Sequence, residues 1–270
     1  MRVLITGAAG TIGRRLADYL RDRHELVLAD LYPPAAPHPN DDWRRVDITR
    51  LGELTEACRG VDAIIHLAIA SGHEGDYEDT AFNDLRFEVN VNGTARVFLA
   101  AARAGVRRVI HTSSIMVVWG YGPGEYVGPE AEPRPVGTYA VTKHLAELLA
   151  RDYTLHHGLT TVCLRIARPV DPHDPRLRTH PIRPQWIAFP DLCRAYELAL
   201  LAPLTGYHAM LLVGETASRR WDLSAARRLL GYEPHYRLDE LGCTLDESAP
   251  LLVDETATEP RAQASGPVGK

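Results

Sequence analysis

Tyr139 and Lys143 have the types and the spacing that the oxidation of an alcohol requires. They lie four residues apart in a segment with a helical pattern, so both side chains are predicted to share one face of a helix. A hydride can leave a secondary alcohol only if the hydroxyl proton is removed, and a tyrosine phenolate is a candidate base for that step. Free tyrosine has a pKa of about 10, which a cation at Lys143 and a positively charged nicotinamide would lower. An exposed pair at this spacing also occurs by chance, so the surrounding sequence has to supply the context.

A pair of hydroxyl side chains ends the strand that is expected over residues 106–114. Ser113 and Ser114 lie at the carboxyl end of this strand, and parallel sheets bind their ligands at that edge. We assign Ser114 to hydrogen-bond the reacting oxygen of the substrate, with Ser113 as the alternative.

A glycine run after the first strand predicts a dinucleotide site. Gly7, Gly10 and Gly13 lie where a buried strand turns into a helix. The first glycine allows the tight turn, the second lets a pyrophosphate approach the backbone, and the third lets the helix pack on the strand. Thr11 and Ile12 begin the helix, whose free backbone N–H groups can bind phosphates.

Asp30 closes the second predicted strand and indicates which dinucleotide binds. A carboxylate there accepts hydrogen bonds from both adenosine ribose hydroxyls and repels a 2′-phosphate, which favours NAD over NADP. Arg14 and Arg15 are the counter-argument, because either could pair with a 2′-phosphate. The alternative is that both belong to a solvated first helical turn.

Two further strand ends are expected beside the cofactor. Asp47 ends a short strand over residues 43–48, where it could reach the adenine amino group or cap the helix at about 50–58. The small residues after the strand at 61–68 would pass beside the cofactor. Lys143 would also hold the nicotinamide ribose. The predicted cofactor contacts in these regions are Asp47, Ile48, Leu67, Ala68, Tyr139 and Lys143.

Strands and helices alternate from the start of the chain, which predicts a doubly wound parallel α/β sheet with right-handed crossovers. A long helix is expected over about 82–104, where Gly93 costs roughly 1 kcal/mol against alanine and so indicates close packing. A second long helix is expected over about 137–157. The prolines within residues 168–187 exclude regular elements and indicate a substrate-facing lid or loop.

The rest of the chain predicts a helix at 189–201, a strand at 207–213 and a helix at 222–230. Gly231 is the expected C-cap of that last helix. We divide the chain into a dinucleotide-binding core (1–166), a small substrate lobe interleaved with it (167–246) and a disordered tail (247–270).

Composition narrows the class of protein. The chain has 270 residues, a formal charge of −5 and 24% charged residues, so neither nucleic acid nor a membrane is an expected partner. No apolar run approaches the roughly 20 residues that span a bilayer. The four cysteines are scattered, which favours a reducing, cytoplasmic location. The 12 histidines show no metal-ligand spacing, and we expect no metal.

These motifs resemble the extended short-chain dehydrogenases/reductases, the NAD-dependent epimerase/dehydratase family. The resemblance covers about residues 1–240 and implies a Rossmann fold, NAD and a Ser-Tyr-Lys site. Asn90 resembles the position that supports a water next to the lysine. Family members commonly form homodimers through two long helices. The matching residues are Gly7-x-x-Gly10-x-x-Gly13, Asp30, Asp47, the run Asn90-Val-x-Gly-Thr, Ser113-Ser114, Tyr139-x-x-x-Lys143, Leu164-Arg165, and the segment from Trp221 to Pro234.

The chain departs from the family pattern in two places. A count from Trp119-Gly120 places Ile115 where many relatives carry the catalytic hydroxyl. Arg168 stands at the usual position of an asparagine, which argues against a nucleotide sugar and leaves arginines suited to a carboxylate or a phosphate. At least two of the four arginines in this region are expected to be solvated. The predicted substrate contacts are Ser114, Ile115, Tyr139, Arg168, Arg178 and Arg183; Arg176 is the fourth arginine.

We therefore expect an NAD-dependent dehydrogenase that acts on a sugar-like alcohol or hemiacetal. The chain is nearest in size to the uronate dehydrogenase-like members of the family, which points to a uronic acid. An epimerase or dehydratase with tightly held NAD is the second reading, and a non-catalytic NAD(P)-binding regulator is the third. The intact Tyr139 and Lys143 argue against the regulator.

Overall fold

A computed structural model describes residues 1–32, 37–39, 41–71, 76–122, 124–215 and 220–249. The predicted tail lies outside the described residues from residue 250 onward, and residues 247–249 form a turn. The strands of the main sheet are β1 (Arg2–Thr6), β2 (Glu25–Asp30), β3 (Asp42–Arg45), β4 (Ala63–His66), β5 (Arg108–Ser114), β6 (Thr160–Ile166) and β9 (Tyr207–Leu212).

All pairings in this sheet are parallel, and the strand order is β3-β2-β1-β4-β5-β6-β9. The order reverses between β1 and β4, and in doubly wound sheets ligands bind outside the carboxyl ends of the strands at such a reversal. This arrangement is the predicted doubly wound fold. The strand expected over 43–48 is shorter than predicted and ends at Arg45.

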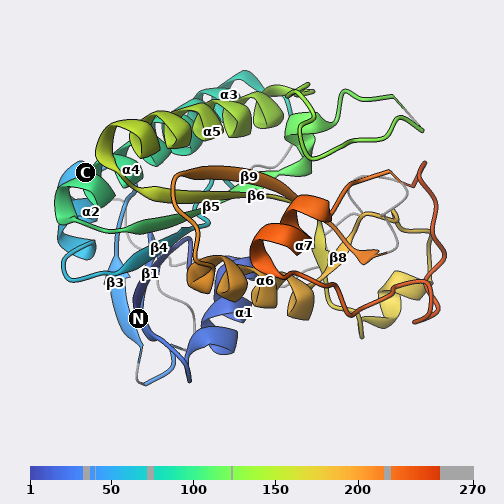
Figure 1. Ribbon diagram of the computed structural model, residues 1–270, viewed down its shortest axis with the longest axis horizontal. Helices are drawn as coiled ribbons and strands as arrows, with labels where there is room; N and C mark the ends of the chain where they lie inside the picture. Colours follow the sequence, from blue (N-terminus) through green and yellow to red (C-terminus); the bar gives the residue numbers. More distant parts are fainter. Residues whose placement is uncertain (33–36, 40, 72–75, 123, 216–219, 250–270) are drawn as a thin grey trace, which may run out of the picture.

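Helices cover both faces of the sheet (Figure 1). The covering helices are α1 (Thr11–Leu20), α2 (Leu51–Ala57), α3 (Thr80–Arg86), α4 (Thr94–Ala104), α5 (Thr138–His157), α6 (Phe189–Leu201) and α7 (Ser224–Leu230). One apolar core joins α1, α6 and α7 to one face, and a second core joins α2, α4 and α5 to the other. Gly231 ends α7 in the left-handed conformation, as predicted for its C-cap.

The helix predicted over 82–104 is interrupted by a π-helical segment, Phe87–Gly93, between α3 and α4. Single π-helical turns place an extra residue in the helix and occur often at functional sites. Gly93 ends this segment, and a Cβ atom there would lie 2.7 Å from Ile48 Cδ1. The close packing predicted for this glycine is therefore present.

The proline-rich segment at 168–187 contains short regular elements, so the prediction that it holds none is wrong. Pro169–Val170 (β7) pairs with Ile187–Ala188 (β8), and Pro175–Arg178 forms a 3₁₀ turn. Proline is compatible with the first turn of a helix because its missing N–H would be unpaired there anyway. Trp186, Leu238 and neighbouring side chains form a small separate core in this lobe.

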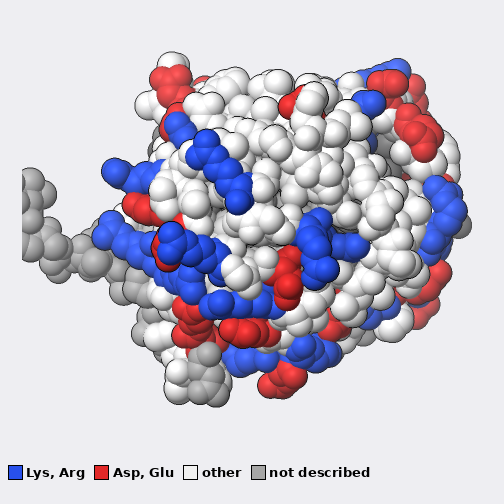
Figure 2. All heavy atoms as spheres, turned by 60° about the vertical axis from the view of Figure 1, so that its left-hand side comes forward, with Lys and Arg blue, Asp and Glu red and all other residues white. Residues whose placement is uncertain are grey.

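The surface carries charges of both signs. Figure 2 shows basic and acidic side chains interleaved on one face, below a largely uncharged area. In the described part of the chain, no helix is both long enough and apolar enough to cross a membrane. Within the same ranges, no cluster of histidine, cysteine and carboxylate side chains has the arrangement of a metal site.

Candidate active site

The glycine run forms a backbone cradle at the amino end of α1. Gly7 adopts a φ of +73°, and a Cβ atom on it would lie 2.7 Å from the backbone nitrogen of Ala68. A Cβ atom on Gly13 would lie 2.4 Å from the carbonyl oxygen of Gly7. Gly10 is the N-cap of α1 and has no side chain to cover the first turn, so the N–H groups there face outward. The cradle has the shape and the donors that a pyrophosphate needs.

Asp30 lies beside this cradle at the end of β2. Its Oδ2 accepts a hydrogen bond from Ala9 N at 3.0 Å, and its Oδ1 accepts one from Leu31 N at 2.7 Å. Two backbone donors thus fix the carboxylate next to the phosphate-binding turn. Arg15, one of the two arginines that could favour a 2′-phosphate, stacks on the ring of Phe189 at 4.3 Å instead. The cradle and the carboxylate together fit NAD.

Asp47 does not cap α2, so that part of its prediction is wrong. Its Oδ1 accepts from the backbone N and the hydroxyl of Thr49, at 2.8 and 2.7 Å, while Arg50 occupies the N-cap position without a side-chain cap. Burial opposes ionisation of Asp47, but these hydrogen bonds and Arg50 outweigh it and lower the pKa of the carboxyl. Ile48 packs against Gly93, and Leu67 N donates to Thr6 O at 3.1 Å beside the glycine cradle.

Tyr139 is half-buried in the first turn of α5 and lies near Ser114 at the end of β5. The Ser114 hydroxyl is near enough to favour ionisation of Tyr139, and Ser114 Oγ accepts a hydrogen bond from Met116 N at 3.2 Å. Burial raises the pKa of Tyr139 above its ordinary value. The Ser114 hydroxyl and the positive charge of Arg86 act in the opposite direction. In the protein alone burial dominates, so the expected net lowering of this pKa is not present.

Lys143 lies one turn further along α5. Its Nζ donates to the carbonyl oxygen of Thr112 at 2.8 Å and is 5.9 Å from the ring centroid of Tyr139. Burial lowers the pKa of Lys143 to about 8, against the opposing effect of the Glu147 carboxylate. The lysine therefore remains mostly protonated at neutral pH.

Ser113 points away from Tyr139 and into a buried ion pair. Its hydroxyl donates to Glu147 Oε1 at 2.5 Å. The same carboxylate receives Arg165 Nε at 2.9 Å and Nη2 at 2.8 Å, a two-pronged pair that satisfies both oxygens. Successive side chains of a strand face opposite sides, so only one serine of the pair can reach Tyr139.

Asn90 lies in the π-helical segment and joins two parts of the site. Its Oδ1 accepts from Ala70 N at 2.8 Å, and its Nδ2 donates to Thr142 Oγ1 at 3.1 Å. The Thr142 hydroxyl in turn donates to Tyr139 O at 2.8 Å. This buried amide therefore connects the chain after β4 to the helix that carries Tyr139.

The structure adds two residues that the sequence analysis missed. The ring of Tyr77 lies 6.5 Å from that of Tyr139 in an edge-on arrangement, and Arg86 lies beneath the Tyr77 ring. Tyr77 falls in the polar segment before α3, and nothing in its own type or spacing separates it from the rest of that segment. Arg86 precedes Asn90 by four residues, and that spacing on one helix face was the signal available in the sequence.

The residues predicted to bind substrate divide into two groups. Arg168 stacks on the indole of Trp186 at 4.8 Å, and Arg183 lies 5.3 Å from that of Trp119. Arg178 donates instead to the carbonyl oxygens of Leu241, Asp174 and Pro172, which ties the lobe together. Arg176 pairs with Asp174 at 2.7 Å, and Ile115 packs in the main core. Arg178, Arg176 and Ile115 are therefore held by contacts within the protein.

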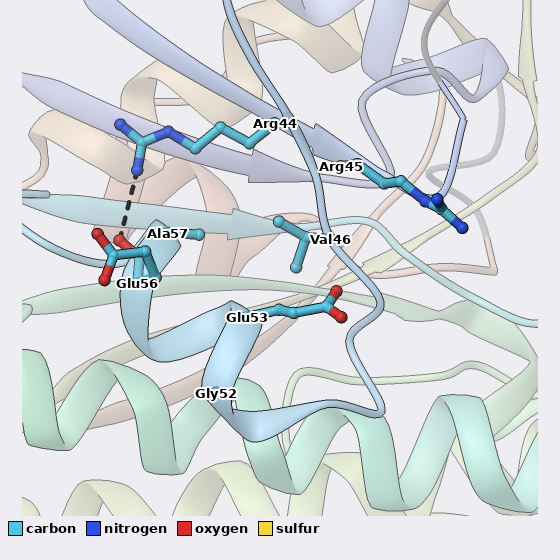
Figure 3. A pocket seen from close by; sticks show the side chains of 7 residues that line it. All are labelled: Arg44, Arg45, Val46, Gly52, Glu53, Glu56 and Ala57. Carbon is cyan, nitrogen blue, oxygen red and sulfur yellow. Dashed lines mark hydrogen bonds between the residues drawn. The ribbon is translucent and has the colours of Figure 1, made fainter.

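A surface groove of about 370 Å³ lies elsewhere, between the edge strand β3 and α2 (Figure 3). Its walls carry charges of both signs, and Arg44 Nη1 donates to Glu56 O across it at 3.4 Å. It contains no residue of the predicted site. The residues that line it are Arg44, Arg45, Val46, Gly52, Glu53, Glu56 and Ala57.

Comparison with known proteins identifies the family and the fold. A family model described as the NAD dependent epimerase/dehydratase family matches residues 3–208. A uronate dehydrogenase of Pseudomonas syringae pv. tomato is 28% identical over 99% of this chain and 95% of its own length. A uronate dehydrogenase of Pseudomonas putida is 30% identical over 86% and 83% of the two chains. A mutant uronate dehydrogenase from Agrobacterium tumefaciens, solved with NAD, superposes with a TM-score of 0.75 at 28% identity, covering 88% of this chain and 86% of that one.

Proposed function

The chain belongs to the NAD-dependent epimerase/dehydratase family, and we propose that it is an NAD-dependent dehydrogenase that oxidises a uronic acid or a closely similar sugar. The observation that carries the proposal is the placement of Tyr139 near Ser114, with Lys143 Nζ 5.9 Å from the Tyr139 ring centroid and one helical turn away. This group lies at the same edge of the sheet as the glycine cradle, so one ligand can reach both.

Each residue has a defined part in the proposed reaction. The cradle holds the pyrophosphate and Asp30 the adenosine ribose. When bound, NAD supplies the hydride acceptor. Ser114 binds the reacting oxygen of the substrate, and Tyr139 takes its proton as the hydride leaves. Lys143 keeps a positive charge close to the Tyr139 phenolate, which accepts the proton and becomes neutral.

We propose that residues 167–246 provide most of the substrate contacts and residues 1–166 the NAD contacts. Arg168 and Arg183 are the proposed partners of a substrate carboxylate, since guanidinium groups pair well with carboxylates. The chain is similar to proteins named uronate dehydrogenases, and a uronate carries a carboxylate.

We also propose a homodimer formed through the long helices. Apolar side chains are exposed along this side of the molecule: Leu85, Phe87, Val141, Leu148 and Leu155. The area above the charged band in Figure 2 lies on the side of the sheet that α4 and α5 cover in Figure 1. Exposed apolar patches of this kind mark protein interfaces.

The proposed location is the cytoplasm. All four cysteines are buried free thiols, as expected for a protein that folds in a reducing compartment. Burial raises the pKa of Cys58 to about 12, so this thiol is unreactive toward oxidants.

The proposed function is tested by following NADH formation with purified protein, NAD or NADP, and a panel of uronic acids, aldoses and simple alcohols. We expect net NADH formation with NAD and a uronic acid. NADPH formation with NADP should be much slower. Tyr139→Phe is the matched control and should abolish turnover while it leaves NAD affinity nearly unchanged. Full activity of that variant would remove Tyr139 as the base, and no NADH with any substrate would reject the dehydrogenase.

A further inference from the structure

Arg86 is a buried cation next to the candidate active site. Its side chain is 1% exposed, at the end of α3. Its guanidinium carbon lies 3.9 Å from the ring centroid of Tyr77 and 4.3 Å from that of Phe82. Stacking on two aromatic rings stabilises the charge, yet burying a guanidinium group away from water is costly.

The polar contacts of Arg86 are uneven. Its Nη1 donates to Tyr77 O at 2.6 Å and to Asn83 Oδ1 at 2.7 Å, and Glu78 Oε1 is 4.0 Å away. Within the described ranges, the buried Nη2 atom has no hydrogen-bond partner. The hydrogen bonds of the guanidinium group are therefore made through Nη1, and its charge acts in a region of low dielectric constant, where electrostatic effects are strong.

The contacts of Arg86 continue to the first turn of α5. Glu78 Oε1 accepts a hydrogen bond from Thr138 N at 3.2 Å, directly before Tyr139. The Tyr77 ring, which lies on the guanidinium group, meets the Tyr139 ring edge-on at 6.5 Å. Arg86 thus holds the segment with Tyr77 and Glu78, and Tyr77 contacts the candidate base Tyr139.

Four titratable groups face Tyr139. Lys143 is on the same helix, Tyr77 and Arg86 come from the α3 side, and Tyr196 comes from α6. The two cations differ, because a guanidinium group keeps its proton throughout the range in which enzymes work, whereas the pKa of Lys143 is about 8. Only Arg86 can provide a positive charge that does not change with pH.

We propose that Arg86 is a positioning residue of the reaction, which holds Tyr77 and the start of α5 around Tyr139 and keeps a permanent positive charge on the Tyr77 ring that meets the candidate base. The proposal rests on the proposed dehydrogenase function. Removal of the charge makes the phenolate harder to form, so the rate rises only at higher pH.

The test measures kcat/KM against pH for the parent protein, Arg86→Met, Arg86→Lys and Arg96→Met. Arg96 on α4 is the matched control, since it is half-exposed and pairs with Glu88 at 2.8 Å. For Arg86→Met we expect the acidic limb of the profile to move up by about one pH unit, and kcat at neutral pH to fall about tenfold. Arg86→Lys should keep the limb near its original position with a lower kcat, and Arg96→Met should match the parent.

Affinity for NAD and thermal unfolding are measured on the same variants to separate positioning from loss of fold. If Arg86→Met does not fold, Arg86→Gln replaces it, because its amide can still donate to Tyr77 O. If Arg86→Met or Arg86→Gln folds and the acidic limb of its kcat/KM profile does not move, the proposed role of Arg86 is overturned. A parent protein that forms no NADH rejects the proposed function itself, so the two failures are distinguishable.

Discussion

Burial and ionisation oppose each other at Tyr139. The side chain is half-buried, and the loss of solvent raises the pKa of its hydroxyl, while the proposed reaction needs the phenolate. A serine hydroxyl and two nearby cations, Lys143 and Arg86, favour the phenolate. The roles of Tyr139, Lys143 and Ser114 are predictions from the sequence, with Ser113 as the alternative, and the structure places Ser113 against Glu147. Arg86 was missed because its effect depends on its contact with the Tyr77 ring, which the fold of the segment before α3 brings against Tyr139.

At Asp30, the charge of one carboxylate is expected to decide the cofactor. Asp30→Ala removes the acceptor for the ribose hydroxyls and also the repulsion of a 2′-phosphate. We expect affinity for NAD to fall about tenfold or more, as for the loss of a charged hydrogen bond, while affinity for NADP changes little. Calorimetric titration with both dinucleotides measures this difference, and an equal loss for both would contradict the ribose assignment.

Two buried histidines should make the protein sensitive to acid. Burial lowers the pKa of His66 to about 3 and that of His111 well below its ordinary value, with the charge of Lys143 adding to both effects. At these two histidines, the unfolded chain binds protons below a pH of about 6.5, while the folded chain does not. The free energy of unfolding therefore decreases as pH falls below that value.

His111→Phe should reduce this dependence by up to about 1.4 kcal/mol per pH unit. Denaturant unfolding at several pH values gives the slope, which does not depend on the overall stability of the variant. His180→Phe, at an exposed position, is the control and should leave the slope unchanged. An unchanged slope in His111→Phe would show that His111 does not stay neutral in the folded protein.

The π-helical segment is the main feature at the scale of elements that the sequence did not predict. The pattern of residues 82–104 is that of one helix, and a single extra residue in a turn barely changes apolar periodicity. The turn is fixed by contacts distant in sequence, Asn90 with Thr142 and Gly93 against Ile48. In contrast, α6 was predicted over its observed range because strong local apolar spacing determines it.

Asn90 should be a stabilising residue of this segment. Asn90→Ala removes two buried hydrogen bonds and leaves Ala70 N without its acceptor, which should cost about 2 kcal/mol in the free energy of unfolding. Asn92→Ala, two residues away at an exposed position where the amide bonds Glu88, should cost much less. Chemical denaturation compares the two, and equal losses would contradict a connecting role for Asn90.

At the scale of the whole molecule, the parallel order of strands brings residues 7, 30, 114 and 139 to one edge of the sheet. Alternating strands and helices were sufficient to predict that arrangement. The substrate lobe was harder to predict. The guanidinium group of Arg178, for example, donates hydrogen bonds to three carbonyl oxygens, and no sequence pattern reveals these contacts.

The proposed dimer is a property of the complete helical face. Leu148 on α5 is 49% exposed, so Leu148→Glu should place a charge in the interface and yield a monomer. Leu201 at the end of α6, on the other face of the sheet, is 59% exposed and provides the matched control. Sedimentation analysis should show a dimer for the parent and Leu201→Glu. A dimer that persists in Leu148→Glu would place the interface elsewhere.

The most direct test of the central claim follows the hydride itself. A uronic acid carrying deuterium at the carbon to be oxidised is incubated with the protein and NAD, and both products are analysed by mass spectrometry. The account predicts one deuterium in each NADH formed and an equal amount of oxidised sugar. Deuterium that remains in, or returns to, an unoxidised sugar while NAD stays bound to the protein would contradict it and indicate an epimerase.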